Sequence, residues 1–346
     1  MKKILISDPT LRDGSHAVRH QLSASQIAAY AAAAEAAGIP IVEVGHGNGL
    51  GASSLQVGLS LTDDQAMLKA ARKHLSRSKL GIFLIPGFAT INKDLRPALE
   101  LGADVVRVAC HCTEADTTQR HISFAREQGK EVYGVLMMSH MASAEILLDE
   151  CRKMESYGAE GVILMDSAGA SLPEDVSQKI RVLTNSLNIP VGFHAHNNLG
   201  MAVINSLTAA QAGATILDGT ARGFGAGAGN TQLEVLTAVL QKAGFDTGID
   251  LYKMLDAADL AEREILPAMP TIRSLSIVSG LAGVFSGFAK HVERAAAEHK
   301  VDARDILFEL GRRRAVAGQE DMIIEIASAL ARKQDKQPQK GTKFTN

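Results

Sequence analysis

Tryptophan is absent from this 346-residue chain, tyrosine occurs only four times, and neither sign of charge dominates, since the formal net charge is −2. Without an excess of basic residues or a stripe of basic and aromatic side chains, we expect no binding to nucleic acid or to an anionic membrane. Long apolar runs are also missing, and none approaches the roughly 20 residues of a membrane-spanning helix. The apolar stretch at residues 4–6 is too short for the core of a signal peptide, so we expect a cytoplasmic protein.

Cysteine is scarce, with three copies at Cys110, Cys112 and Cys151. An odd number cannot pair completely, and the spacing C-x-x-C of redox and zinc motifs does not occur. We therefore expect reduced thiols in the core. A metal site at Cys110, His111 and Cys112 is a weak candidate, because neighbouring residues of an extended segment point to opposite faces.

What the chain has instead is a repeated pattern of short apolar segments within an ordinary globular composition. Eight apolar runs occur in the first two-thirds, at residues 4–8, 39–44, 80–85, 105–110, 132–138, 161–165, 190–194 and 215–217. They are continuous rather than alternating, which is typical of parallel strands buried on both faces. With helical segments between them, they predict an α/β fold, a (β/α)₈ TIM barrel over residues 1–248. Strand counting alone leaves a doubly wound open sheet as the alternative.

The pattern changes after residue 248. Helical periodicity without a convincing strand follows at residues 251–264, 274–298, 303–315 and 319–333. It predicts a helical domain over residues 249–333. Residues 334–346 are polar and rich in lysine, and we expect a disordered tail.

The heptapeptide TLRDGSH at residues 10–16 directly follows the first predicted strand. It places Arg12, Asp13 and His16 at the carboxyl end of that strand, where barrel enzymes hold their active sites. The pair Asp13-Gly14 is also an ordinary turn signal, and Arg12 could belong to a structural ion pair.

A second motif, HAH, places His194 and His196 at the end of the seventh predicted strand. Residues two apart on a strand face the same side, so both imidazoles can point at one ion. In a barrel, Asp13 opens on the same face and can complete the set. Two histidines and a carboxylate leave coordination positions open, as a reactive metal requires, and they suit Mn²⁺, Mg²⁺, Co²⁺ or Zn²⁺.

The glycine-rich loop at residues 223–230 ends in Asn230. A dinucleotide loop belongs after the first strand of a βαβ unit, so we expect no nucleotide cofactor. Asn230 could be a fourth ligand, a support for a ligand, or a helix N-cap. Beside a metal, Arg12 would stabilise an enolate and His16 could move a proton.

Less specific candidates are polar residues at other predicted strand ends. They are His46, His111, His140, Asp166 and Ser167. The run Arg312, Arg313 and Arg314 is interpreted as a solvated helix face or a subunit contact.

Several motifs in order give the chain its family resemblance. They are TLRDGSH at 10–16, HGNG at 46–49, RVACHCTEAD at 107–116, MMSHM at 137–141, HAHN at 194–197 and GAGAGN at 225–230. On these the chain resembles the 4-hydroxy-2-oxovalerate aldolase family from residue 3 to about residue 333. The segment at residues 309–322 is similar to the helical communication domain of that family.

The resemblance implies a class II pyruvate aldolase, usually with manganese, on a TIM barrel like that of hydroxymethylglutaryl-CoA lyase. It implies cleavage of 4-hydroxy-2-oxo acids to pyruvate and an aldehyde, in aromatic or steroid catabolism, and an acylating aldehyde dehydrogenase as partner. Asp13, His194 and His196 would bind the metal. Arg12 would stabilise the enolate, His16 would be the base, and Ser167 would contact the substrate carboxylate, with His194 also near the substrate.

The chain departs from the family where a segment with two tyrosines reads GLAGVF at residues 280–285. Leu281 and Phe285 replace the tyrosines, and Phe83 and Ile85 replace leucines of the pocket wall. The resemblance therefore implies the metal and the base but not the substrate range. Two other functions remain open: a Claisen-type acyl-CoA lyase or synthase of the same superfamily, and a non-catalytic scaffold subunit for the dehydrogenase.

Overall fold

The computed structural model describes residues 1–316 and 318–336 of the chain. In this part, eight parallel strands close into a barrel in sequence order. They are β2 (Leu5–Leu11), β3 (Ile41–Val44), β4 (Lys79–Leu84), β5 (Val105–His111), β6 (Glu131–Met137), β7 (Gly161–Asp166), β8 (Val191–Ala195) and β9 (Ile216–Asp218). Because β2 pairs with β9 as well as with β3, the sheet has no open edge. The predicted barrel is confirmed and the open sheet is excluded.

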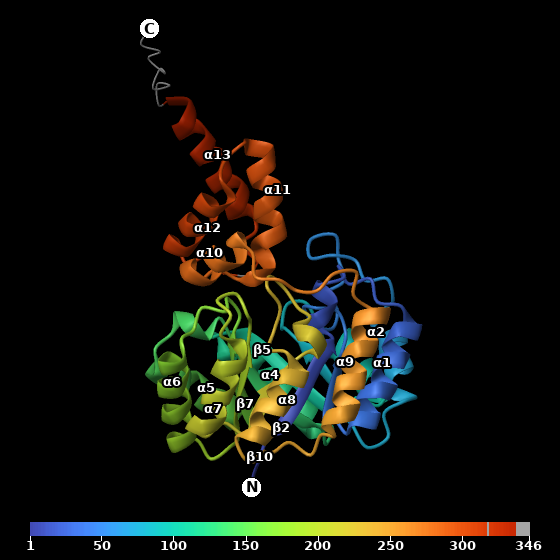
Figure 1. Cartoon of the computed structure of the whole chain (residues 1–346). Coiled ribbons are helices and arrows are strands. Elements are labelled where there is room, and N and C mark those ends of the chain that lie inside the picture. Colours follow the sequence, from blue (N-terminus) through green and yellow to red (C-terminus); the bar gives the residue numbers. More distant parts are fainter. Residues whose placement is uncertain (317, 337–346) are drawn as a thin grey trace.

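Helices cover the outer face of the barrel (Figure 1). They are α1 (Ala24–Ala37), α2 (Asp64–Arg72), α3 (Arg96–Glu100), α4 (Gln119–Glu127), α5 (Ala144–Ser156), α6 (Pro173–Ser186), α7 (Ala202–Ala212) and α8 (Leu233–Lys242). Local sequence sets their ends. The hydroxyl of Ser23 accepts from Gln26 N at the start of α1, and Gly38, with φ 78°, ends the helix.

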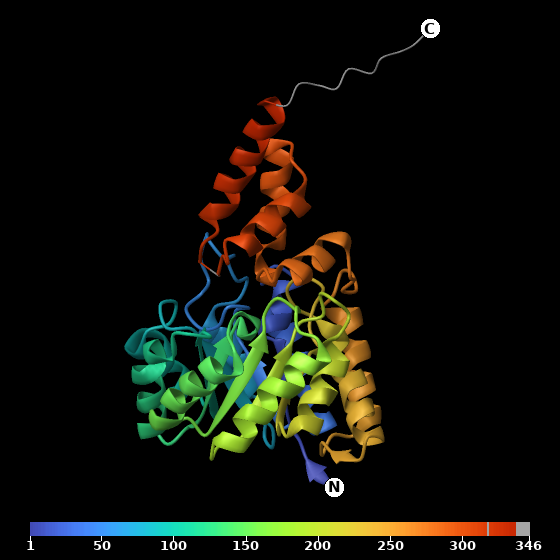
Figure 2. The ribbon, with the colours of Figure 1, turned by 90° about the vertical axis from the view of Figure 1, so that its left-hand side faces the viewer.

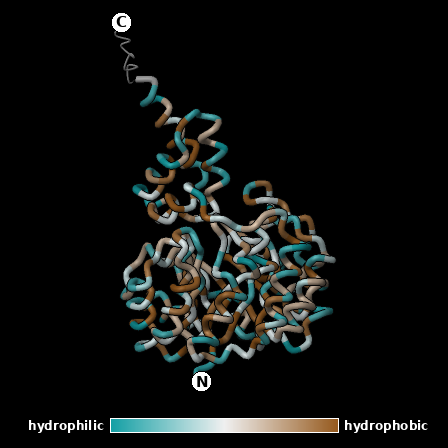
Figure 3. Tube along the Cα trace, viewed as in Figure 1, coloured by the Kyte–Doolittle hydropathy of each residue, from teal (hydrophilic) through white to brown (hydrophobic). Residues whose placement is uncertain are grey.

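The hydrophobic core has an inner and an outer shell. The inner shell fills the barrel with side chains that include Ile41, Phe83, Val135, Ile163 and Ile216. The outer shell lies between the strands and the helices. In Figure 3 apolar segments run through the barrel, whereas hydrophilic segments recur on the outer helices. The helices of the described residues are all too short or too polar to cross a membrane.

A two-stranded parallel sheet at the amino end of the barrel was not predicted. It pairs β1 (Lys2–Lys3) with β10 (Phe245–Asp246). Two-residue strands carry no readable periodicity, so the sequence offers no signal for this contact.

The C-terminal third divides into two parts. Helix α9 (Leu251–Glu264) lies beside α1, and its buried face, which includes Met254 and Ala258, joins the outer core of the barrel. The following helices form a separate hydrophobic cluster above the carboxyl ends of the strands (Figures 1 and 2). They are α10 (Ser274–Ala282), α11 (Ala289–His299), α12 (Ala303–Arg312) and α13 (Asp321–Lys336).

These contacts bear on the expected domain boundaries. Because α9 packs on the barrel, we propose that the helical unit starts after Glu264 rather than at residue 249. The single helix expected at residues 274–298 is wrong: α10 ends where Gly283 adopts φ 64°, and α11 starts at Ala289. Helix α13 continues to Lys336, which is three residues into the tail expected at 334–346. Residues 337–346 of that tail lie outside the described residues.

Candidate active site

The motif at residues 10–16 turns inward at the carboxyl end of β2. Strand β2 ends at Leu11, and a short 3₁₀ helix, η1 (Asp13–His16), follows after Arg12. Arg12 and Asp13 are buried, and Arg12 Nη1 donates to Asp13 Oδ2 over 2.7 Å. Arg12 Nε donates to Glu43 Oε1 over 2.6 Å. Arg12 therefore forms a buried ion pair with Glu43 and also lies beside Asp13 in the candidate site.

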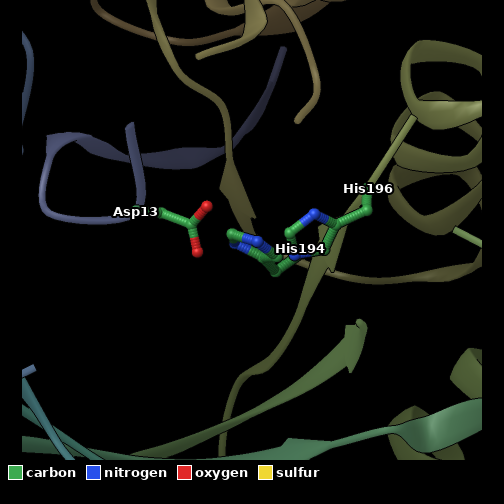
Figure 4. Close-up of side chains that lie close together, drawn as sticks. All are labelled: Asp13, His194 and His196. Atoms are coloured by element: carbon green, nitrogen blue, oxygen red, sulfur yellow. The ribbon is translucent and has the colours of Figure 1, made fainter. Parts of the chain in front are cut away.

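Asp13, His194 and His196 converge, as the sequence predicted. One ligand atom from each residue lies within 4.8 Å of the others, and all three residues are buried. In Figure 4 the carboxylate of Asp13 faces the two imidazoles at the end of β8. His194 Nδ1 lies 2.8 Å from Asp218 Oδ2, and His194 Nε2 and His196 Nδ1 have no hydrogen-bond partner among the described residues.

This donor set fits a divalent metal. Buried polar atoms without partners are costly, and here two imidazole nitrogens stand beside a carboxylate. A ligating histidine almost always bonds a carboxylate, a backbone carbonyl or water through its other ring nitrogen, and His194 Nδ1 has Asp218 in this position. Three protein ligands leave open positions, as catalytic sites do.

Asn230 supports Asp13 and is not a helix N-cap. Helix α8 begins at Leu233 with Gln232 as its N-cap, which removes that interpretation. Asn230 Nδ2 donates to Asp13 Oδ1 over 2.8 Å, while its Oδ1 finds no hydrogen-bond partner in the described part of the chain. The glycine-rich loop passes very close to the side chain of Asn230. A Cβ on Gly225 would lie 2.3 Å from Asn230 Nδ2.

His16 is held in a cluster of three histidines. Its ring lies 4.8 Å from that of His20, edge to face, and His20 stacks on His46 at 3.7 Å. The ring also rests against Gly47, where a Cβ would lie 2.4 Å from His16 Nε2. The sequence drew attention to His46 but not to His20, which folding alone brings to the site.

Burial and neighbouring charge set the protonation states. Burial opposes ionisation of Asp13, but Arg12, His196 and His194 outweigh it and hold the pKa of that carboxyl below its ordinary value. Burial lowers the pKa of His16 to about 4, against the opposing effect of Asp13. The pKa of His196 is lowered to about 4 for the same reason. Near neutral pH Asp13 is therefore ionised, and the imidazoles of His16 and His196 are neutral.

A cavity of about 320 Å³ opens from these groups. Its polar end is lined by Arg12, Asp13, His16, Ser167 and His196, and its apolar wall by residues that include Phe83, Ile85 and Phe285. The hydroxyl oxygen of Ser167 accepts from Met138 N over 3.0 Å, so its proton remains free to donate. Leu281 is 64% exposed and does not line the cavity.

The helical unit closes over the mouth of this cavity. Phe285, Val316 and Glu320 contribute to its lining. Ser286 N donates to Ser167 O over 3.2 Å, and Lys290 Nζ to His16 O over 3.4 Å. The segments that carry Ser167 and His16 are therefore in direct contact with the helical unit.

The less specific candidates have varied surroundings. His111 lines the cavity, whereas His140 Nε2 bonds Gly283 O and Asp166 accepts from Ala170 N and Ser171 N. All three cysteines are free and buried. In the arginine run, Arg312 and Arg313 pair with Glu309, and Arg314 Nη2 donates to Met141 O.

Comparison with known proteins agrees with this geometry. Residues 3–261 match the HMGL-like family, and residues 270–332 match the DmpG-like communication domain. A 4-hydroxy-2-oxovalerate aldolase of Pectobacterium atrosepticum is 64% identical over 340 residues, which cover 98% of this chain and 99% of the relative. The chain belongs to the 4-hydroxy-2-oxovalerate aldolase family. It is a carbon–carbon lyase that has the family's barrel and communication domain.

Further relatives support the assignment. A 4-hydroxy-2-oxovalerate aldolase of Spirochaeta aurantia is 64% identical and covers 94% of this chain and 96% of its own length. The N-terminal domain of a putative aldolase from Bacteroides vulgatus superposes with a TM-score of 0.69 at 26% identity, covering 84% of this chain and 95% of that one. The carboxyl transferase domain of Rhizobium etli pyruvate carboxylase gives 0.79 at 16% identity, covering 96% and 61%, and shows a shared fold.

Proposed function

We propose that this chain cleaves 4-hydroxy-2-oxo acids of the 4-hydroxy-2-oxopentanoate type, reversibly, into pyruvate and an aldehyde. The observation that carries the proposal is the convergence of Asp13, His194 and His196 beside Arg12 and His16 at the polar end of one cavity. The full-length relatives named 4-hydroxy-2-oxovalerate aldolase support it.

Asp13, His194 and His196 would hold a divalent metal, and Asn230 would support Asp13 through Nδ2 or add a further ligand through Oδ1. When bound, that metal would polarise the keto group of the substrate and favour its enolate. Of the ions that suit mixed nitrogen and oxygen ligands, we propose Mn²⁺.

The side chains divide the chemistry. His16, neutral because its pKa is about 4, accepts the proton of the C4 hydroxyl, and the C3–C4 bond breaks as the aldehyde carbonyl forms. The bond electrons pass into the pyruvate enolate, which is then protonated at C3. Arg12 Nη2, with no partner in the described residues, can donate to the enolate oxygen, and Ser167 Oγ can donate to the substrate carboxylate.

The apolar wall of the cavity indicates the kind of aldehyde released. Phe83, Ile85 and Phe285 present rings and methyl groups, so we propose aldehydes with short apolar chains. Phe285 has no hydroxyl that could orient the C4 hydroxyl group of the substrate.

Replacement of metal ligands tests the proposal. Asp13→Ala and His194→Ala should abolish Mn²⁺-dependent release of pyruvate from 4-hydroxy-2-oxopentanoate, measured with a lactate dehydrogenase coupled assay. Full activity of either variant, or of the unchanged chain in metal-free buffer, would refute the metal-dependent aldolase.

The helical unit suggests a partner. Its match to a communication domain, and its contacts with Ser167 and His16, support docking to an acylating aldehyde dehydrogenase that takes up the aldehyde. Co-expression with such a dehydrogenase should give one hetero-oligomer in gel filtration, and separate elution of the two proteins would contradict this docking.

The two other functions have less support. A Claisen-type acyl-CoA enzyme would need an acid to protonate its product, and the loop at residues 223–230 contains no cysteine for that role. A scaffold subunit would release no pyruvate, so the same assay separates it from an aldolase.

A further inference from the structure

Beneath the proposed metal site, five side chains form a continuous buried chain of polar contacts across the barrel. Arg12 Nε bonds Glu43 Oε1 over 2.6 Å, and Glu43 Oε2 accepts from Arg107 Nη1 over 3.2 Å. Arg107 Nη2 donates to Asp218 Oδ2 over 2.6 Å, and the same oxygen lies 2.8 Å from His194 Nδ1. Each member is at most 2% exposed. We call this series the barrel relay.

Both ends of the barrel relay stop at the proposed chemistry. At one end Arg12 Nη2, and at the other His194 Nε2, have no hydrogen-bond partner within the described residues. Arg12 Nη2 is the group proposed to meet the enolate, and His194 Nε2 is the atom left to bind metal. The relay therefore has one free end for substrate and one for the ion.

Arg107 is the central member and touches neither end directly. It comes from β5 and binds Glu43 of β3 and Asp218 of β9, on strands that are not its neighbours. Burial disfavours its charged form, but Asp218 and Glu43 outweigh burial and hold the pKa of Arg107 above its ordinary value. The guanidinium thus remains charged at any working pH.

Stability alone is a weak reason for such an arrangement. Taking two charges out of water costs free energy that their attraction often fails to recover, and apolar replacements of buried ion pairs are frequently neutral or stabilising. The planar guanidinium of Arg107 has a rigid arrangement of donors. It can therefore hold the two carboxylates of Glu43 and Asp218 at fixed positions relative to one another.

On these contacts we propose that Arg107 is a positioning residue that sets Arg12 and His194 relative to one another through Glu43 and Asp218. The inference rests on the proposed function, since it needs a metal at His194 and an enolate at Arg12. Without the Arg107 guanidinium, the Glu43 side chain could rotate, and Arg12, which is bonded to Glu43, would lose its fixed position. It would also leave Asp218 without its cation, so that it orients the His194 imidazole less firmly.

The test uses Arg107→Lys and Arg107→Met in the full chain. Lys keeps the charge but cannot hold both carboxylates, and Met keeps much of the volume without charge. Arg72→Met is the matched control, because Arg72 pairs with Asp104 before the start of β5, at the opposite end of the barrel from the site. Mn²⁺ binding to metal-depleted protein is followed by electron paramagnetic resonance, and oxalate, which resembles the pyruvate enolate, is titrated at saturating Mn²⁺.

We expect Arg107→Met to weaken Mn²⁺ binding and oxalate binding each by about 10-fold to 100-fold, the range seen for partners of metal ligands. Arg107→Lys should recover part of both losses, and kcat should fall in parallel at saturating Mn²⁺. Arg72→Met should bind both probes as the unchanged chain does. If Arg107→Met does not fold, Arg107→Lys decides.

Affinities within twofold of the unchanged chain would overturn the assignment, whatever the melting temperature, because a merely structural arginine changes stability without changing the affinity of the folded protein. Failure of the proposed function is seen separately, in the unchanged chain, as absence of Mn²⁺ binding or of pyruvate release.

Discussion

A single methyl group on Gly47 should disable the proposed base while leaving the metal site intact. A Cβ at this position would lie 2.4, 2.5 and 2.7 Å from three atoms of the His16 ring. Ordinary contact begins near 3.4 Å, so the ring would have to withdraw by about 1 Å. Gly47 is not among the residues with positive φ, and Gly47→Ala therefore adds little backbone strain.

A displacement of this size has a large kinetic effect. Misplacing a reacting group by about 1 Å can cost about 100-fold in rate, or about 2.7 kcal/mol of barrier. We expect kcat of Gly47→Ala to fall by about that factor, approaching the loss in His16→Ala, with Mn²⁺ affinity unchanged. The assay is lactate dehydrogenase coupled pyruvate release at saturating Mn²⁺.

Gly244→Ala serves as the control for an added methyl group. Gly244 has φ 86° and open space around its Cβ position, in the loop before β10 at the amino end of the barrel. This variant should lose about 1 kcal/mol of stability and keep its kcat. Wild-type kcat in Gly47→Ala would refute the placement of His16 as the base.

Other predictions concern the remaining site residues. Asn230→Ala removes a donor to Asp13 and should weaken Mn²⁺ binding about 10-fold or more, as measured by calorimetry. Phe285→Tyr restores a hydroxyl at the cavity and should raise the ratio of kcat/KM between the two C4 enantiomers of the substrate; an unchanged ratio would show that this position does not orient the C4 hydroxyl group. Because the pKa of His16 is lowered to about 4, kcat/KM should stay level on acidification through about pH 6.5 and fall only near pH 4 to 5, and a midpoint near 6.5 would contradict its burial. Buried His20 and His46, with pKa values of about 2 and about 4, cannot take up the protons that the unfolded chain binds near pH 6.5, so urea unfolding should show stability falling as pH drops from about 6.5 to 4.

Much of the fold was readable because parallel barrel strands are buried on both faces. Continuous apolar runs located all eight strands, and strand-end polar residues located Asp13, His194 and His196 before any geometry was known. The two-residue partners β1 and β10 are too short to show a period. The break at Gly283 was not predicted because the sequence shows helical periodicity both before and after it.

The barrel relay was harder to foresee. Glu43 and Arg107 each interrupt an apolar strand, in the stretches IVEV and VVRVAC, and an unpaired charge there would be very costly. A charged residue in an apolar strand therefore indicates a buried partner of opposite charge, but the sequence does not show which residue that partner is. The pairing of Arg107 with both Glu43 and Asp218 depends on barrel closure, which brings residues from distant parts of the sequence to the same interior space.

Asp13, His194 and His196 are proposed to bind a metal that this chain needs to release pyruvate. The most direct measurement is a titration of metal-depleted protein with Mn²⁺, recording bound ion by paramagnetic resonance and pyruvate release from 4-hydroxy-2-oxopentanoate in the same samples. Activity should rise in proportion to one bound Mn²⁺ per chain, and neither should appear in Asp13→Ala. Pyruvate release at full rate without bound metal would contradict the metal requirement, and stoichiometric Mn²⁺ binding by Asp13→Ala would contradict the proposed ligands.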